Sequence, residues 1–226
     1  MVSENKFKAV LFDLGGTLVK TADISEIFRR ILEIYGVRAS IKNISKAYEK
    51  NERELGVKDM VESGSGYWIK WNQKMLKRLK VQGDVEFLAT QIDALWWNHA
   101  DLEVYPEVSE TLVQLERKGV KSGIVTNSFE KDFQSILQRL GLADHFDVVV
   151  GIDTCKSAKP DREIFLFAVN KLDVRPEEAL FVGDSIQYDF EGAKAAGLKP
   201  LLVDRNNEAI MSAQTIRSLA EVLAYV

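Results

Sequence analysis

Four polar side chains stand at the ends of apolar runs or at the start of a helical pattern, where they could act together. They are Asp13, Thr126, Lys159 and Asp184. Two carboxylates can bind Mg²⁺, which prefers oxygen ligands. A hydroxyl, an ammonium group and backbone N–H groups can bind a phosphoryl group. A carboxylate close to phosphorus can also act as a nucleophile and divide one displacement into two steps.

The apolar runs before three of these residues place the polar groups at one edge of a sheet. Residues 9–12, 123–125 and 180–183 are short and show no helical period, so we interpret them as buried parallel strands. In open α/β sheets the carboxyl ends of the strands form the ligand crevice. Gly15 and Gly16 follow Asp13 and allow a sharp turn with close approach of a ligand. The alternative is structural: the aspartates would cap turns and helices, and Lys159 would be solvated.

The chain from residue 105 onward alternates between strand and helix patterns. Strands are expected at 120–126, 147–151, 179–183 and 201–203. Helices are expected from Pro106 to Gly119 and at 129–140, 161–172, 186–196 and 216–224. Such alternation predicts a parallel sheet with both faces covered, an α/β fold of the Rossmann-like kind.

Residues 20–104 show helical patterns and no convincing strand. Helices are expected from the cap at Asp23 to Gly36 and at 46–55, 67–79 and 85–98, with a loop or helix start at 63–66. We therefore expect a core domain of residues 1–19 and 105–226 and a helical domain of residues 20–104, with hinges near Lys20 and Val104. All four tryptophans lie in the helical segment. We interpret them as its core, with one of them facing a substrate as the alternative.

Composition excludes several classes of protein. The chain is 46% hydrophobic and 28% charged with a net charge of −4, which is typical of a globular protein and carries no nucleic-acid footprint. No stretch approaches the ~20 apolar residues of a membrane span, and the first apolar run is too short for a signal peptide. A single cysteine, Cys155, excludes an internal disulfide and suits a reducing cytoplasm. We expect a cytoplasmic protein; the sequence does not indicate its oligomeric state.

These stretches, taken in order, resemble the four motifs of the haloacid dehalogenase-like (HAD) hydrolase superfamily. They are residues 9–18, 123–128, 159–161 and 180–185 followed by Asp189, and the resemblance covers nearly the whole chain. The helical segment resembles the cap inserted after the first motif in the helical-cap phosphatase subclass. Residues 105–108 (YPEV) are similar to a segment of archaeal members that act on glyceraldehyde 3-phosphate.

The resemblance implies a role for each site residue. Asp13 is the expected nucleophile and a Mg²⁺ ligand, and the carbonyl of Gly15 is a second ligand. Thr126 and Asn127 contact the phosphoryl group or hold it near the edge of the sheet, and Lys159 neutralises the phosphate and the nucleophile. Asp184 binds Mg²⁺ directly, whereas Asp189 reaches the metal through water or orients the site. The expected partner is a small phosphorylated metabolite, with no nucleic acid and no membrane.

The sequence departs from the family at Gly15. Phosphatases of the family usually carry there a second aspartate, which serves as general acid and then as base, a contribution of ~10²–10⁴-fold. Four readings stay open: a phosphatase that moves the proton in another way, a phosphonatase, a dehalogenase, or a catalytically impaired phosphate-binding protein. A phosphonatase would need a Schiff-base lysine, for which the candidates are Lys42, Lys46, Lys50 and Lys58. Because dehalogenases use no Mg²⁺, Asp184 and Asp189 argue against that reading.

Overall fold

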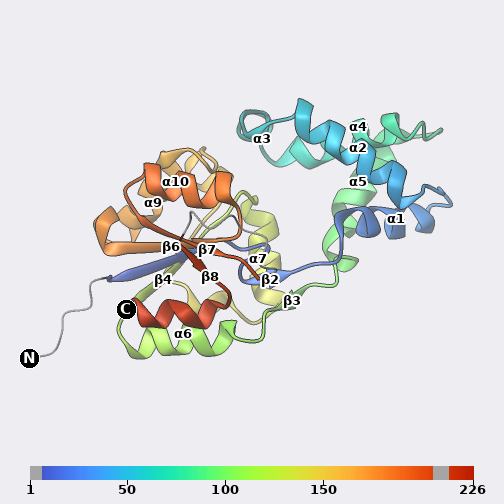
Figure 1. Cartoon of the computed structure of the whole chain (residues 1–226). Coiled ribbons are helices and arrows are strands. Elements are labelled where there is room, and N and C mark those ends of the chain that lie inside the picture. Colours follow the sequence, from blue (N-terminus) through green and yellow to red (C-terminus); the bar gives the residue numbers. More distant parts are fainter. Residues whose placement is uncertain (1–6, 206–213) are drawn as a thin grey trace, which may run out of the picture. The chain divides into compact units, whose positions relative to one another are not determined.

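The computed structural model describes residues 7–205 and 214–226, and the chain divides into two compact units (Figure 1). One unit contains the chain up to Lys20 and from Glu103 onward, and the other runs from Thr21 to Leu102. Residues 1–6 of the expected core domain lie outside the described residues. None of the described helices is long and apolar enough to cross a membrane.

A six-stranded parallel sheet forms the centre of the first unit and confirms the expected α/β fold. Its strands lie in the order β5-β4-β1-β6-β7-β8. They are β1 (Ala9–Phe12), β4 (Lys121–Val125), β5 (Val148–Val150), β6 (Ala179–Gly183), β7 (Lys199–Val203) and β8 (Thr215–Ile216). In the central strand β1, Phe12 lies in register with Ile124 of β4 and Val182 of β6. All four residues of β1 are buried, which its unbroken apolar sequence predicts.

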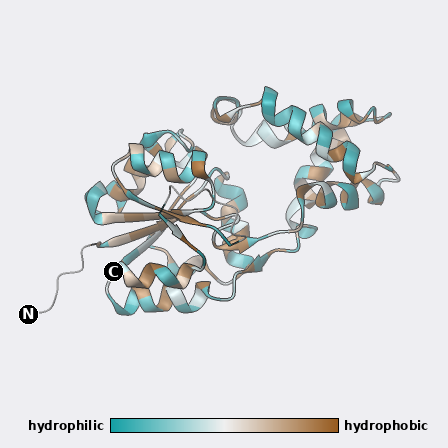
Figure 2. Ribbon diagram, viewed as in Figure 1, coloured by the Kyte–Doolittle hydropathy of each residue, from teal (hydrophilic) through white to brown (hydrophobic). Residues whose placement is uncertain are grey.

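Helices cover both faces of this sheet. They are α6 (Val108–Arg117), α7 (Glu130–Arg139), α8 (Ile152–Cys155), α9 (Arg162–Lys171) and α10 (Glu191–Ala195). Figure 1 shows α9 and α10 on one face and α6 on the other. The buried face of α9, which includes Phe165 and Val169, belongs to one core cluster with Leu11 and Phe181 of the strands. Figure 2 shows hydrophobic residues along the strands and mixed colours along the helices, the pattern of a covered sheet.

Three expected elements of the sheet-containing unit, outside its β2–β3 ribbon, differ from the structure. The helix expected at 186–196 is a π-helical turn, Ile186–Phe190, followed by α10, because the N–H groups of Asp189 and Phe190 both bond the carbonyl of Ser185. The helix expected at 216–224 is shorter: Ile216 belongs to β8, and Leu219–Ala224 forms a 3₁₀ helix (η6). Pro106 does not begin a helix, because Val108 N–H bonds the Tyr105 carbonyl in a turn and α6 begins at Val108.

The second unit is built from helices. They are α1 (Ile24–Ile34), α2 (Ile41–Glu54), α3 (Val57–Ser63), α4 (Tyr67–Arg78) and α5 (Val85–Leu95), with 3₁₀ turns at Gly64–Gly66 (η1) and Trp96–Asn98 (η2). The short helix α3 was not expected from the sequence. Asp23 caps α1 by accepting hydrogen bonds from Ser25 N and Glu26 N. Trp71 is buried among the rings of Tyr48, Tyr67 and Trp68, which fits its interpretation as core.

A two-stranded antiparallel ribbon stands where the chain leaves the first unit and returns. It pairs β2 (Val19–Lys20) with β3 (Glu103–Val104), and Lys20 forms an ion pair with Glu103 at 2.6 Å. The expectation of no strand between residues 20 and 104 is therefore wrong at its two ends. Two-residue strands carry too little periodicity to appear as a pattern, and these depend on each other across a long stretch of chain.

Candidate active site

Asp13 stands directly after β1, at the carboxyl end of the central strand. Its backbone N–H bonds the Val182 carbonyl of β6, so the sheet ladder fixes the residue at the point where the strand ends. The following loop closes on itself, because Leu18 N–H and Val19 N–H both bond the Leu14 carbonyl. Asp13 as a whole residue is 7% exposed. The chain therefore holds one carboxylate at the carboxyl end of β1, on a hydrogen-bonded loop, with restricted access to solvent.

Lys159 bridges two carboxylates at this edge. Its Nζ donates to Oδ1 of Asp13 at 2.5 Å and to Oδ1 of Asp189 at 2.6 Å. Lys159 lies between α8 and α9 and is 3% exposed, and Asp189, on the π-helical turn, is 2% exposed. Asp13 and Lys159 are 146 residues apart in the chain. The fold thus brings together the residues that the sequence motifs selected.

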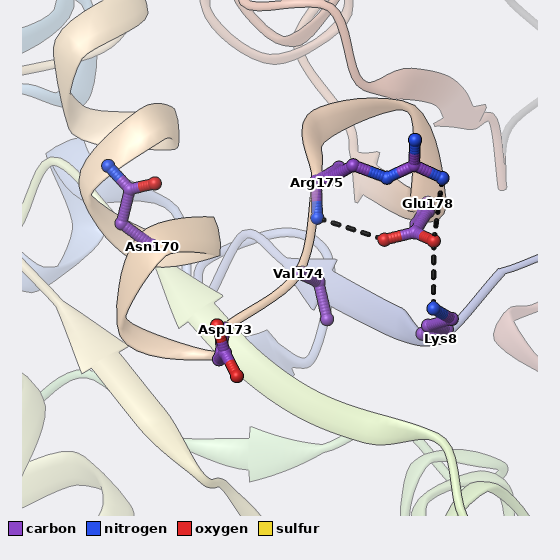
Figure 3. Close-up of a pocket in the computed structure, with 6 residues that line it drawn as sticks. All are labelled: Lys8, Asn170, Asp173, Val174, Arg175 and Glu178. Atoms are coloured by element: carbon purple, nitrogen blue, oxygen red, sulfur yellow. Dashed lines mark hydrogen bonds and ion pairs between the residues drawn. The ribbon is translucent and has the colours of Figure 1, made fainter.

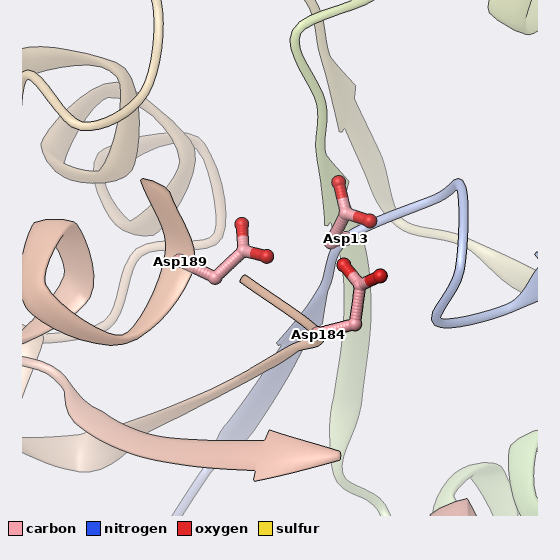
Figure 4. A group of neighbouring side chains, drawn as sticks. All are labelled: Asp13, Asp184 and Asp189. Atoms are coloured by element: carbon pink, nitrogen blue, oxygen red, sulfur yellow. The ribbon is translucent and has the colours of Figure 1, made fainter. Parts of the chain in front are cut away.

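Asp184 completes a cluster of three carboxylates. Asp13, Asp184 and Asp189 each offer an oxygen atom within 4.8 Å of the others (Figure 4). Asp184 is the exposed member and follows β6 directly, whereas Asp189 is held by Lys159 and accepts the N–H of Ser185 at 2.9 Å. An all-oxygen, anionic donor set fits a hard divalent cation such as Mg²⁺. Since Asp189 is already engaged on both oxygens, Asp13 and Asp184 are the better placed direct ligands.

Burial and mutual repulsion set the charges in this cluster. Burial raises the pKa of Asp13 to about 7, and Asp189 and Asp184 add to the rise, although the Lys159 ammonium opposes it. Burial alone would lower the pKa of Lys159, but the charges of Asp13 and Asp189 outweigh it and raise the value. Desolvation and the charge of Asp189 also raise the pKa of Asp184. A bound cation would relieve this repulsion, which makes the cluster suited to one.

Thr126 and Asn127 stand at the carboxyl end of β4, next to β1. Thr126 is buried, its N–H bonds the Val150 carbonyl, and its Oγ1 lies 3.2 Å from Ser128 Oγ. Asn127 contacts the backbone of Lys159 twice: Nδ2 donates to the carbonyl at 3.0 Å, and Oδ1 accepts the N–H at 2.7 Å. The sequence placed Asn127 at the site but gave no sign of this contact, because its partner lies 32 residues away.

The two glycines after Asp13 meet different surroundings. Gly16 has a φ of +80°, and a Cβ built on it would lie 2.1 Å from Oδ2 of Asp184. Gly15 is exposed, and a Cβ built on it would find no atom within 4 Å. Gly16 is therefore required for close approach to Asp184, whereas the geometry of Gly15 accepts a side chain.

Arg205, just after β7, was not recognised from the sequence. Its guanidinium forms an ion pair with Glu107, donates to the Thr17 carbonyl at 2.9 Å and lies 3.6 Å from the centre of the Tyr105 ring. Glu107 also accepts the N–H of Leu219. Arg205 thus joins the loop after Asp13 to the segment that follows β3. A lone arginine after a strand has no sequence pattern that predicts such a network.

A surface pocket of about 410 Å³ lies at the amino ends of the strands, opposite the carboxylate cluster (Figure 3). Lys8 and Glu178, which directly precede β1 and β6, line it together with Arg175. Glu178 forms ion pairs with Lys8 at 2.8 Å and with Arg175 at 2.9 Å, so one carboxylate is shared between two cations. The pocket lies at the amino ends of the strands and is separate from the carboxylate cluster.

The fold and the site define an α/β protein with an acidic centre at the carboxyl ends of its strands. The chain belongs to the haloacid dehalogenase-like hydrolase family, whose model matches residues 7–197. It is 30% identical to the glyceraldehyde 3-phosphate phosphatase of Methanopyrus kandleri, over 88% of this chain and 84% of that one. It is 32% identical to a phosphoglycolate phosphatase of Aquifex aeolicus, over 86% and 84% of the two chains.

A solved structure of a HAD phosphatase is also similar to this chain in sequence and fold. The HAD phosphatase from Thermococcus onnurineus is 29% identical, with a TM-score of 0.61 over 96% of both chains. The expected family of hydrolases is thereby confirmed.

Proposed function

We propose that this chain is a Mg²⁺-dependent phosphatase of small phosphorylated metabolites that acts through an aspartyl-phosphate on Asp13. The observation that carries the proposal is the contact of Lys159 Nζ with Asp13 and Asp189 beside the exposed carboxylate of Asp184. A cation site next to a buried carboxylate and an ammonium group suits phosphoryl transfer, in which charge on the phosphoryl oxygens must be stabilised.

Each residue has a part in this chemistry. Lys159 engages Oδ1 of Asp13, which leaves Oδ2 to attack phosphorus. A bond forms between that oxygen and phosphorus while the bond from phosphorus to the substrate oxygen breaks, and the substrate oxygen leaves as an alkoxide that takes a proton from water. Water then attacks the aspartyl-phosphate and returns Asp13 and inorganic phosphate. Asp13 and Asp184, with the carbonyl of Gly15, would hold Mg²⁺, which screens the phosphoryl oxygens from the carboxylates when bound.

Thr126 lies on the strand next to Asp13 and supplies a hydroxyl to the phosphoryl group in this proposal. Asp189 fixes Lys159 and does not bind the metal directly. We propose that the helical unit, Thr21 to Leu102, serves as a cap that excludes water during turnover, with hinges near Lys20 and Val104.

The experiment is phosphate release by the purified chain with Mg²⁺ and with EDTA. The substrates are p-nitrophenyl phosphate and a panel that includes glyceraldehyde 3-phosphate and 2-phosphoglycolate, the compounds in the names of the two relatives. We expect release that EDTA abolishes and that Asp13→Asn removes. Undiminished activity of Asp13→Asn would overturn the covalent mechanism, and absence of release from every substrate would overturn the phosphatase proposal.

A further inference from the structure

We infer that Asn127 is a positioning residue for Lys159 and acts on turnover through that lysine, rather than as a side-chain ligand of the phosphoryl group. This inference rests on the proposed function. The sequence motif alone suggested a phosphate contact for Asn127, and the structure shows its side chain bonded to another part of the site.

The side-chain amide of Asn127 forms two hydrogen bonds with the backbone of Lys159, as a backbone amide of a neighbouring strand would. The carboxamide of Asn127 offers an acceptor oxygen and an N–H donor, and both meet the same residue, Lys159. The oxygen accepts the Lys159 N–H at 2.7 Å, and the nitrogen donates to the Lys159 carbonyl at 3.0 Å. A carboxylate could not donate, and a hydroxyl could not span both atoms. The residue type is therefore matched to this geometry.

The segment that carries Lys159 needs such an anchor. It lies between α8 and α9, outside the strands of the sheet, whereas Asn127 follows β4, which pairs with β1. Asn127 thereby connects the Lys159 backbone to β4, the neighbour of the strand β1 that Asp13 directly follows. The lysine side chain has a flexible four-carbon stem. Fixing the Lys159 backbone therefore reduces the number of positions that Nζ can occupy.

The expected consequence is a loss of rate rather than of binding. Nζ of Lys159 contacts Asp13 at 2.5 Å, and a displacement of about 1 Å in a catalytic group can cost ~10²-fold in rate. The phosphoryl group would keep the Thr126 hydroxyl and backbone N–H groups as contacts. Removing the Asn127 side chain should therefore lower kcat and leave KM nearly unchanged.

The test compares Asn127→Ala and Asn127→Asp with the wild-type chain on p-nitrophenyl phosphate. We expect kcat to fall ~10–100-fold in Asn127→Ala, with KM and inhibition by inorganic phosphate changed by less than about 3-fold. Asn127→Asp keeps the size of the side chain and its acceptor oxygen, so a loss of rate in this variant is not explained by a cavity. We expect a lower kcat because a carboxylate oxygen then faces the Lys159 carbonyl oxygen. Asn170→Ala, at an exposed position of α9, is the matched control and should keep wild-type values.

A double-mutant cycle with Lys159→Ala, measured in single turnovers, decides whether the effect passes through the lysine. If it does, adding Asn127→Ala to Lys159→Ala changes the rate by less than about 2-fold. Losses that multiply, a KM that rises while kcat holds, or no change in Asn127→Ala would each overturn the inference. A wild-type chain that releases no phosphate would instead overturn the proposed function, so the two failures are distinguishable.

Discussion

The α-carbon of Gly16 lies against the carboxylate of Asp184, and a methyl group there would stand 2.1 Å from Oδ2. The loop after Asp13 and the carboxylate of Asp184 after β6 are therefore fitted to each other without room for a side chain. Any residue other than glycine must push Asp184 aside or reshape the loop.

Gly16→Ala should raise the Mg²⁺ concentration for half-maximal activity ~10-fold or more, because Asp184 is displaced from its position in the cluster. The measurement is a Mg²⁺ titration of phosphatase activity. Gly36→Ala is the matched control, since Gly36 also has a positive φ, +72°, but has no atom within 4 Å of an added Cβ. It should lower stability through backbone strain alone and leave the Mg²⁺ requirement unchanged. Equal Mg²⁺ requirements in the two variants would contradict the displacement of Asp184.

Gly15→Asp should raise turnover of alkyl phosphates ~10-fold or more, because it adds a general acid and base near the leaving oxygen. The structure leaves space for it: the Gly15 backbone is outside the left-handed region, and an added Cβ meets no atom within 4 Å. The gain should be smaller for p-nitrophenyl phosphate, whose leaving group needs little protonation. A comparison of kcat for the two substrate types in a folded variant checks this. Unchanged or lower rates for both would mean that another group already moves the proton or that none is needed.

Mg²⁺ should stabilise the protein more above the pKa of Asp13 than below it. Burial raises that pKa to about 7, so a proton competes with the metal for the carboxylate in mildly acidic solution. We expect a larger Mg²⁺-induced rise in Tm at about pH 8.5 than at about pH 5.5, because Asp13 is ionised at the higher of these pH values. The rise should become nearly independent of pH in Asp13→Asn, and an equal rise at both pH values in the wild-type chain would contradict the prediction.

In the metal-free protein, the contribution of Asp13 to folding stability changes with pH in the direction opposite to that of a salt-bridged carboxylate. The pKa of Asp13 in the folded state lies above its ordinary value of 3.8, so the folded chain keeps a proton that the unfolded chain has released. The contribution of Asp13 to stability therefore falls as pH rises from about 4 to about 7. Denaturant unfolding of the wild-type chain and of Asp13→Asn in EDTA, across this range, measures the difference.

Arg205→Met should lower the free energy of unfolding by about 2 kcal/mol, because it removes hydrogen bonds to Glu107 and the Thr17 carbonyl and the contact with Tyr105. Although burial opposes it, Arg205 and backbone N–H groups hold the pKa of Glu107 below its ordinary value of 4.5. The contribution of Glu107 is thus complete above pH 4.5 and is lost as pH falls through the lowered value. Denaturant unfolding at neutral and acidic pH measures it. A stability gap between the wild-type chain and Arg205→Met that widened in acid would contradict this assignment.

Apolar runs in the sequence predict the parallel sheet and place two of the clustered carboxylates at strand ends, whereas Asp189 was expected only from the family resemblance. Asp13 and Asp184 could be found because each directly follows an unbroken apolar run. The partners of Lys159 could not be derived from local pattern alone, because they depend on contacts across 146 and 30 residues.

Elements that depend on a few specific contacts could not be predicted from the sequence either. The π-helical turn depends on two N–H groups that share the Ser185 carbonyl, and the Arg205 network depends on aromatic and carbonyl groups nearly a hundred or more residues away. None of these leaves a periodic trace in the sequence.

The pairing of β2 with β3 has a consequence for how such a chain can vary. The two crossing points, Val19–Lys20 and Glu103–Val104, are neighbours at strand spacing, about 4.8 Å, and their backbone pairing lies within the first unit. That distance is one that a short hairpin turn spans. The residues between them are therefore a replaceable module: their length and fold can change through evolution while the register of Phe12 with Ile124 and Val182 is preserved.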